Sequence, residues 1–260
     1  MNRDEFLKAV KEDPYQIENA DEAFKKDKEI VLTAVKGNGN VLEYAHVSLK
    51  KDKDVVLAAI KEGAHAIAFA DDTLKKDKNI MLTAIKDNGD SLEHAHSSLK
   101  KDKDVVLAAI KSSGSAIEYA DASFQKDKKI VLMAVSKSSE ALNYADASLK
   151  KDKEVVKASL KQNGYSLQYA DTSLKKDKEI VSMAVQSNGN ALRFADASLQ
   201  KNKEIVMLAV NKTGRALEYV DKSLTKDKEV VMAAVKQDGE ALEYADKSLK
   251  KDKDIVKAAK

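Results

Sequence analysis

Apolar residues recur at the same places every 25 residues along the chain. In one unit, "DKDVVLAAIKSSGSAIEYADASFQK" from Asp102, the apolar residues of 105–110 follow an i, i+1, i+4, i+5 pattern. This pattern predicts a helix with one apolar face. A shorter apolar segment at 116–120 predicts a second helix. No stretch alternates apolar and polar residues between turn residues, so strands are not expected.

The spacing of the repeat is strict and covers essentially the whole sequence. One acidic or amide residue marks each unit at intervals of 25 with no insertion: Asp27, Asp52, Asp77, Asp102, Asp127, Asp152, Asp177, Asn202, Asp227 and Asp252. Counting from Asn2 gives ten full units and a partial eleventh. Repeats that bury their apolar faces only against their neighbours form solenoids. We therefore expect an all-α solenoid of about ten repeats, each with two short helices and a turn.

The ends of the chain depart from the pattern in ways that suit caps. Pro14 stands at the turn glycine, Gln16 and Asn19 replace apolar and aromatic residues, and Lys260 puts a charge at an apolar register. We expect a single domain over 1–260, with 1–26 as an N-terminal capping repeat and 252–260 as a C-terminal capping half-repeat.

Polar and small residues mark the ends of the predicted helices. Aspartate before each apolar run is suited to accept from the free N–H groups of the first turn, and Asn202 is an equally good cap. Replacing Asp127 by alanine should therefore cost stability, and replacing it by asparagine should not. Small residues at one helix position allow close helix approach: Ala34, Ala59, Ala84, Ala109, Ala134, Ala184, Ala209 and Ala234.

Glycine recurs after the first helix, where we expect a left-handed residue to close it. Seven copies carry it: Gly39, Gly89, Gly114, Gly164, Gly189, Gly214 and Gly239. Ala64 and Ser139 depart. Valine at position 164 should be costly, because it resists a positive φ.

The run "GRALEYVDKSLTKDKEVVMAAVK", from Gly214 to Lys236, resembles a bacterial repeat family known as domain of unknown function number 4116. The resemblance recurs in nearly every unit. It implies an all-α repeat fold and no catalytic activity.

The composition narrows the possible functions. The chain of 260 residues has 46 basic and 43 acidic side chains, interleaved throughout, for a net charge of +3, and it has no cysteine. Disulfide and thiolate chemistry are excluded. No apolar run has the length of a signal peptide or a membrane span, so a cytoplasmic protein is expected. Only Arg3, Arg193 and Arg215 could read base edges, and nucleic acid is therefore disfavoured as a partner.

Two ladders of side chains follow the repeat. Lysines before and after each cap form the first, with the candidate anion ladder at Lys26, Lys51, Lys76, Lys101, Lys126, Lys151, Lys176, Lys201 and Lys226. They could bind an anionic partner, but we favour a solvated edge in which each lysine pairs with a nearby carboxylate. One position is nearly always aromatic: Tyr44, Phe69, His94, Tyr119, Tyr144, Tyr169, Phe194, Tyr219 and Tyr244. Such a row could stack bases or hold a peptide, although a packed spine is the favoured interpretation.

The sequence carries no sign of catalytic chemistry. The four histidines are spaced so that they do not converge on one ion, and no phosphate loop or nucleophile–histidine–carboxylate set is present. We therefore expect no enzyme, no cofactor and no metal site.

Some positions vary from unit to unit near the glycine and the second helix. They give the candidate partner-binding residues Asn40, His65, Asp90, Glu140, Tyr165, Arg193 and Arg215. Variation on a constant core is where specificity resides in repeat scaffolds, although drift at exposed sites would look the same. We expect a monomeric, non-catalytic protein-interaction or scaffolding solenoid. A self-assembling structural element and a polyanion binder are the alternatives.

Overall fold

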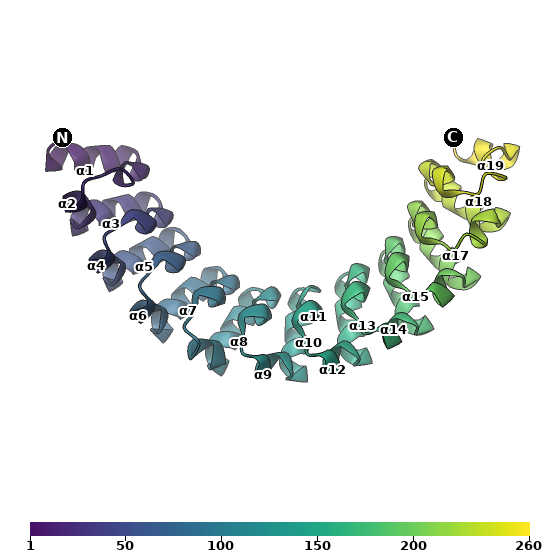
Figure 1. The fold of residues 1–260 in the computed structure, drawn as a ribbon, viewed down its shortest axis with the longest axis horizontal. Helices are drawn as coiled ribbons and strands as arrows, with labels where there is room; N and C mark the ends of the chain where they lie inside the picture. Colours follow the sequence, from purple (N-terminus) through teal and green to yellow (C-terminus); the bar gives the residue numbers. More distant parts are fainter. The chain divides into compact units, whose positions relative to one another are not determined.

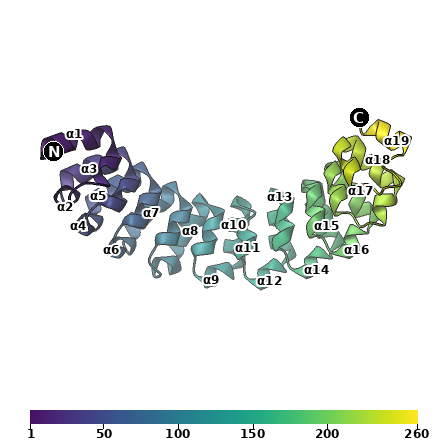
Figure 2. The same cartoon turned by 45° about the horizontal axis from the view of Figure 1, so that its top comes forward.

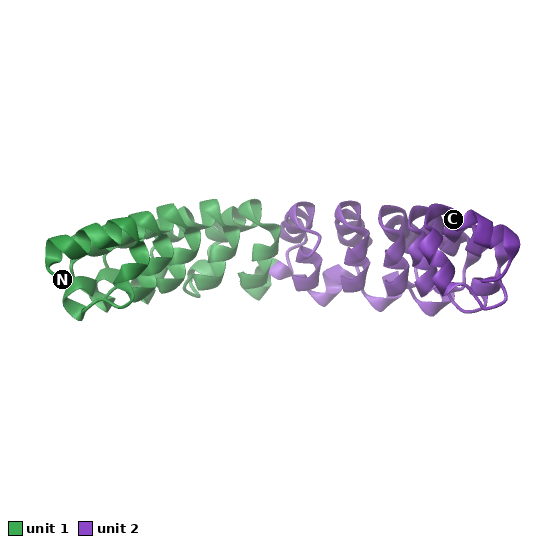
Figure 3. Cartoon of the chain, turned by 90° about the horizontal axis from the view of Figure 1, so that it is seen from above, with its two compact units in different colours: residues 1–124 green, residues 125–260 purple.

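The computed structural model describes residues 1–260, and every regular element in it is a helix. The predicted all-α fold of 25-residue repeats is confirmed. The chain forms two compact units, residues 1–124 and 125–260 (Figure 3). The single domain over 1–260, with its terminal caps, stays a prediction.

Each repeat begins with a ten-residue α-helix. In unit 1 these long helices are α1 (Arg3–Glu12), α3 (Lys28–Gly37), α5 (Lys53–Glu62), α7 (Lys78–Asp87) and α8 (Lys103–Ser112). In unit 2 they are α10 (Lys128–Lys137), α13 (Lys153–Gln162), α15 (Lys178–Ser187), α17 (Lys203–Lys212) and α18 (Lys228–Gln237), followed by the six-residue α19 (Lys253–Ala258).

The second predicted helix is a 3-10 helix in all copies but one. The 3-10 helices are η1 (Pro14–Ile17), η2 (Gly39–Tyr44), η3 (Ala64–Phe69), η4 (Gly89–His94), η6 (Gly114–Tyr119), η7 (Gly164–Tyr169), η8 (Gly189–Phe194), η9 (Gly214–Tyr219) and η11 (Gly239–Tyr244). The exception is the short α-helix α11 (Ala141–Tyr144).

The predicted turn is itself a single helical turn in most copies. These short helices are α2 (Glu22–Lys25), α4 (Val47–Lys50), α6 (Asp72–Lys75), η5 (Leu99–Lys101), α9 (Ala122–Gln125), α12 (Ala147–Lys150), α14 (Thr172–Lys175), α16 (Ala197–Gln200) and η10 (Leu224–Lys226). Within each unit they follow one another along one edge, on the same side of the long helices (Figures 1 and 2).

The long helices bury the predicted apolar face. In α8, Val105, Val106, Ala109 and Ile110 are fully buried, and the equivalent residues are buried in every other long helix except α1 and α19, which bury fewer. Within each unit, neighbouring long helices pack side by side, and the 3-10 helices pack between them and on each other. The predicted small residues, Ala59 among them, lie in these contacts with no exposed surface.

The glycines are required for close approach and not for a left-handed backbone. No residue of the chain has a positive φ, so the predicted left-handed closure is wrong. A Cβ on Gly39 would instead overlap the carbonyl oxygen of Ala59 in the next long helix. A Cβ on Gly164 would overlap the carbonyl oxygen of Ala184 in the same way, and a Cβ on Gly214 that of Ala234. Where the 3-10 helix begins with glycine, the missing side chain lets that helix start directly against the end of the next long helix.

One joint uses serine in place of glycine and alanine. Ser139 occupies the glycine position, and Ser159 of α13 occupies the position of the small residue it contacts. Ser159 is fully buried, and its hydroxyl donates to the carbonyl oxygen of Ser139 at 3.0 Å. A buried hydroxyl needs such a partner, and this is also the copy in which the 3-10 helix is replaced by α11.

A backbone hydrogen bond joins successive short helices. The N–H of Asp71, which precedes α6, donates to the carbonyl of Lys50 at the end of α4 at 3.0 Å. The same bond runs from His46 to Lys25 in unit 1 and from Asp171 to Lys150 in unit 2. These bonds satisfy backbone groups that the short helices cannot satisfy internally.

The aspartates cap the long helices as predicted. Asp127 Oδ1 accepts from the backbone N–H groups of Lys129 at 2.9 Å and Ile130 at 3.2 Å. In the copy with asparagine, Asn202 Oδ1 accepts from Ile205 at 3.2 Å. Both side chains satisfy donors that a helix start leaves free.

We expect Asp127→Ala to lower the free energy of unfolding by about 1 kcal/mol, because it leaves these N–H groups without an acceptor. Asp127→Asn should be nearly silent, since the amide oxygen accepts equally well. Urea unfolding followed by circular dichroism measures both. Equal, large losses from the two variants would show that the carboxylate charge matters and the cap does not.

Candidate interaction edge

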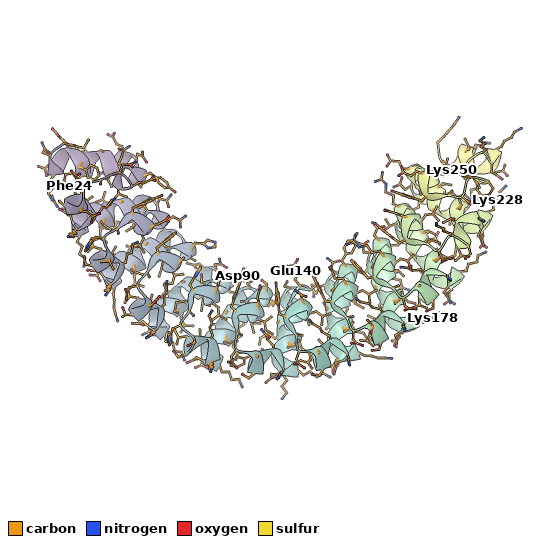
Figure 4. All side chains as sticks on the ribbon, in the orientation of Figure 1. Phe24, Asp90, Glu140, Lys178, Lys228 and Lys250 are labelled. Carbon is orange, nitrogen blue, oxygen red and sulfur yellow. The ribbon has the colours of Figure 1, made fainter.

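The variable positions lie at the start and near the end of each 3-10 helix. We call the variable edge of a unit the surface formed by its residues equivalent to Asn40 and Glu43, the second and fifth residues of η2. In Figure 4, Asp90 of unit 1 lies on the edge opposite Phe24, which belongs to the row of short helices. In unit 2, Glu140 holds the position equivalent to Asp90.

The variable edge of unit 1 contains a hollow of about 380 Å³. Two predicted residues, Asn40 and His65, lie in its wall. The full lining is Tyr15, Asn40, Glu43, Tyr44, His65, Ala68 and Phe69. The rings of Tyr15 and Tyr44 meet edge to face, with centroids 6.4 Å apart and planes at 64°. The hollow is thus walled by aromatic rings and carries one carboxylate.

The variable edge of unit 2 brings two predicted residues into contact. The guanidinium carbon of Arg193 lies 5.4 Å from the ring centroid of Tyr165 and 4.4 Å from that of Phe194. The two rings meet edge to face at 5.9 Å and 79°. Cation–π contact of this kind favours arginine over aromatic faces.

The other predicted residues of the edge lie apart from these clusters. Arg215 pairs with Asp238 at 3.2 Å and with Glu240. Asp90 accepts from the hydroxyl of Ser115 at 3.2 Å. Glu140 is exposed just before α11, where its side chain caps no backbone group. The structure therefore divides the predicted binding residues between one hollow, one aromatic–arginine cluster and isolated positions.

The aromatic residues form a half-buried row beside this edge. Tyr44, Phe69 and Tyr169 are all of intermediate exposure, as a packed spine requires. His94 holds the same position, and burial lowers its pKa because the charged ring is poorly solvated, while Glu93 opposes the shift. A neutral His94 can therefore pack like its aromatic equivalents.

The candidate anion ladder faces carboxylates of the next short helix. Lys51 lies 3.8 Å from Asp71, and the equivalent pairs of Lys101, Lys151, Lys176 and Lys201 span 3.8 to 4.0 Å. The remaining members form no ion pair: Lys26, Lys76, Lys126 and Lys226. At Lys26 and Lys76 the facing position is histidine, His46 or His96.

Most of the lysines that directly follow the caps are paired more closely. Lys28 Nζ lies 2.8 Å from Asp52 and 2.9 Å from Asp54 in the next repeat. Lys128 makes the same two contacts, with Asp152 at 2.7 Å and Glu154 at 2.8 Å. The favoured interpretation of these lysines, pairing with carboxylates of adjacent repeats, agrees with these distances. Pairing also offsets the unfavourable position of an ammonium at a helix start.

Two histidines take the place of capping aspartates. His46 Nδ1 accepts from the backbone N–H of Ser48 at 3.2 Å and lies 2.8 Å from its hydroxyl. His96 contacts Ser98 in the same way. No three histidine or carboxylate side chains are grouped so that they could hold a metal ion.

Two kinds of residue in these contacts were not predicted from the sequence. Tyr15 was not among the candidate residues, because the first repeat departs from the pattern and was interpreted as a cap. Tyr15 nevertheless holds the same repeat position as Asn40 and Tyr165. The sequence also carried no sign of the part played by the lysine that ends the short helix α14 and by its equivalent Lys250. Lys175 Nζ donates to the carbonyl of Gln168 at 2.7 Å, and Lys250 donates to that of Glu243 at 2.6 Å. These lysines cap the 3-10 helices and are not part of the anion ladder.

A protein-family model described as "Domain of unknown function (DUF4116)" matches the chain in overlapping segments: residues 2–50, 31–75, 52–100, 77–125, 102–150, 127–175, 152–200, 177–225 and 227–259. No curated protein and no solved structure matches the chain. No helix is long and apolar enough to cross a membrane.

Proposed function

The chain belongs to the DUF4116 family, whose description assigns no function, and we propose that it is a non-catalytic module that binds a protein partner along its variable edges. The observation that carries this proposal is the hollow of unit 1. It gathers Asn40, His65 and the ladder residues Tyr44 and Phe69 into one concave surface. Concave sites with aromatic walls and a few polar groups are typical of binding surfaces.

The geometry supports a protein partner better than a polyanion. Six of the lysines after the caps lie 2.6 to 2.9 Å from the capping aspartate of the next repeat. Phosphate binding would have to displace these partners, and the variable edge of unit 1 itself carries Glu43, Asp90 and Glu93. Acidic groups on a binding surface favour basic partners.

The repetition of the chemistry supports a role without catalysis. Carboxylates and lysines recur in every repeat, whereas an active site combines groups that occur together once. We further propose a cytoplasmic monomer that acts as a scaffold, with self-assembly as the weaker alternative.

Selection of peptides from a random displayed library, with the purified chain as bait, tests this proposal. Isothermal titration of the selected peptides at 0.15 M salt then compares two double variants. His65→Ala/Arg215→Ala changes the variable edges, and Val47→Ala/Lys222→Ala changes exposed positions beside the short helices. We expect the first to weaken binding by about tenfold or more, as loss of anchoring contacts does, and the second to change it less than about twofold.

Two results would overturn the proposal. One is a selection that yields no binding peptide. The other is peptide binding that the His65→Ala/Arg215→Ala variant retains and the Val47→Ala/Lys222→Ala variant loses. Tight binding of heparin that Lys101→Ala and Lys201→Ala weaken would support the polyanion alternative in its place.

A further inference from the structure

The hollow of unit 1 has an internal counterpart six repeats later. Tyr15 and Tyr44 are in register with Tyr165 and Phe194 of unit 2. The two ring pairs have nearly the same geometry, with centroids 6.4 and 5.9 Å apart and planes at 64° and 79°. The same aromatic frame therefore occurs once in each unit.

In unit 2 this frame holds a cation that belongs to the chain itself. The Arg193 guanidinium lies over both rings, 4.4 Å from the centroid of Phe194 and 5.4 Å from that of Tyr165. The pKa of the neighbouring Tyr219 hydroxyl is raised first by burial and then by Glu218, and Arg193 opposes the shift. Two aromatic rings therefore hold a guanidinium at this place in the repeat.

In unit 1 the frame lacks its cation. Glu43 stands where unit 2 has Arg193, and Ala68 stands where unit 2 has Glu218. The Glu43 side chain is exposed and forms no ion pair, so its carboxylate is available beside the rings. Both of these unit 1 residues, Glu43 and Ala68, line the hollow of about 380 Å³.

The charge around this hollow is negative. The pKa of the Tyr44 hydroxyl is raised, first by burial and then by the carboxylates of Glu18 and Glu43, which disfavour a further negative charge. The same field attracts a cation.

We propose that the hollow of unit 1 binds an arginine side chain of the partner protein, with the guanidinium against Tyr15 and Tyr44 and paired to Glu43. This inference rests on the proposed function, because it names the chemistry that the variable edge recognises. A guanidinium suits the site better than an ammonium, since it stacks on rings and forms a two-pronged pair with a carboxylate.

Titration with two blocked peptides tests the inference on the full chain. The probes are acetyl-Gly-Arg-Gly-amide and its citrulline equivalent, which has the same shape and no charge. Nuclear magnetic resonance shifts of the chain report binding. We expect the arginine peptide to bind about tenfold more tightly than the citrulline peptide, and Glu43→Gln to weaken it by about threefold to tenfold. Glu22→Gln, which removes an exposed carboxylate from the short helix α2 and not from the variable edge, is the matched control and should leave it unchanged.

Exchanging the two frames gives a second, independent readout. Glu43→Arg/Ala68→Glu copies unit 2 and should abolish binding, because the new arginine fills the hollow. Arg193→Glu/Glu218→Ala copies unit 1 and should raise the number of bound arginine peptides from one to two per chain. Thermal unfolding of each variant confirms that it is folded. Tyr15→Ala should also weaken binding without loss of fold, since Tyr15 is 44% exposed.

Equal binding of the two peptides, or binding that Glu43→Gln and Glu43→Arg/Ala68→Glu leave unchanged, would overturn the inference. Such a result is distinguishable from failure of the proposed function. Displayed peptides that bind the variable edges without arginine would retain the protein-binding role and reject only the arginine site.

Discussion

Replacing Gly164 by alanine is expected to lower the free energy of unfolding by about 2–3 kcal/mol, the cost of forcing a methyl group into a filled space. The added Cβ would overlap the carbonyl oxygen of Ala184 and lie about 3.1 Å from the backbone nitrogen of Asn188. Backbone atoms of a packed helix cannot move aside as a flexible side chain can. The strain must therefore separate η7 from α15, and valine at the same position should cost more.

Gly63→Ala is the matched control for this prediction. Its Cβ would meet no atom within 4 Å, and its φ of −174° is extended backbone that any residue adopts. Alanine there should be neutral or stabilise the fold by about 0.5 kcal/mol, since it restricts the unfolded chain. Urea unfolding midpoints compare the two variants, and hydrogen exchange locates the weakened joint. Similar effects of Gly164→Ala and Gly63→Ala would refute close approach as the reason for the glycines.

Stability is expected to fall steeply as the pH drops below about 4, the ordinary pKa of aspartate. Lysine of the preceding repeat lowers the pKa of many capping aspartates by hydrogen bonding, against an opposing effect of burial. These are Asp77, Asp102, Asp152 and Asp177. Side-chain hydrogen bonds from serine lower the pKa of Asp121, Asp171 and Asp221 at the short helices.

The direction of the pH effect follows from these lowered pKa values. The folded chain keeps its carboxylates ionised to a lower pH than the unfolded chain does, so the unfolded state binds more protons below pH 4. The stabilisation is present in full above the unfolded pKa and is lost as the pH falls through the folded values. Because the contact recurs along the chain, small contributions add.

Thermal midpoints between pH 2 and 7 at constant ionic strength measure this effect. We expect a plateau above about pH 5 and a steep fall below pH 4. A variant with asparagine at 77, 102, 152 and 177, the substitution found naturally at Asn202, should show a shallower fall. A midpoint that does not change between pH 2 and 4 would contradict the prediction.

The sequence predicted most of the fold because its signals are local and repeated. The caps such as Asp102 and the buried face of 105–110 follow from helix geometry alone. The role of the glycines could not be predicted in this way. Glycine at the end of a helix can serve either a left-handed turn or close approach to a neighbouring helix. The contact between Gly39 and Ala59 joins different repeats, and only their packing distinguishes close approach from a left-handed turn.

The candidate site was predictable only in part. Asn40, His65, Tyr165 and Arg193 were predicted as binding residues because their positions vary between repeats. Variation does not show which of these side chains contact one another. The contact of Arg193 with Tyr165 depends on how far one 3-10 helix lies from the next. The hollow depends further on Ala68, whose small side chain is informative only once its aromatic neighbours are placed.

The repeated Gly–Ala joint has a consequence for how such a chain can change during evolution. Most joints use the same contact between glycine and alanine, so most repeats can lie next to one another in a different order. The fourteen residues 48–61 and 98–111 are identical, and near-identical segments in a gene are sites of unequal recombination. Recombination between these two segments, which lie two repeats apart, would insert or remove two repeats without creating an unmatched interface. The recombined protein would keep its core and acquire a new order of side chains along its variable edge. New binding specificities are therefore accessible in single genetic steps that leave folding intact.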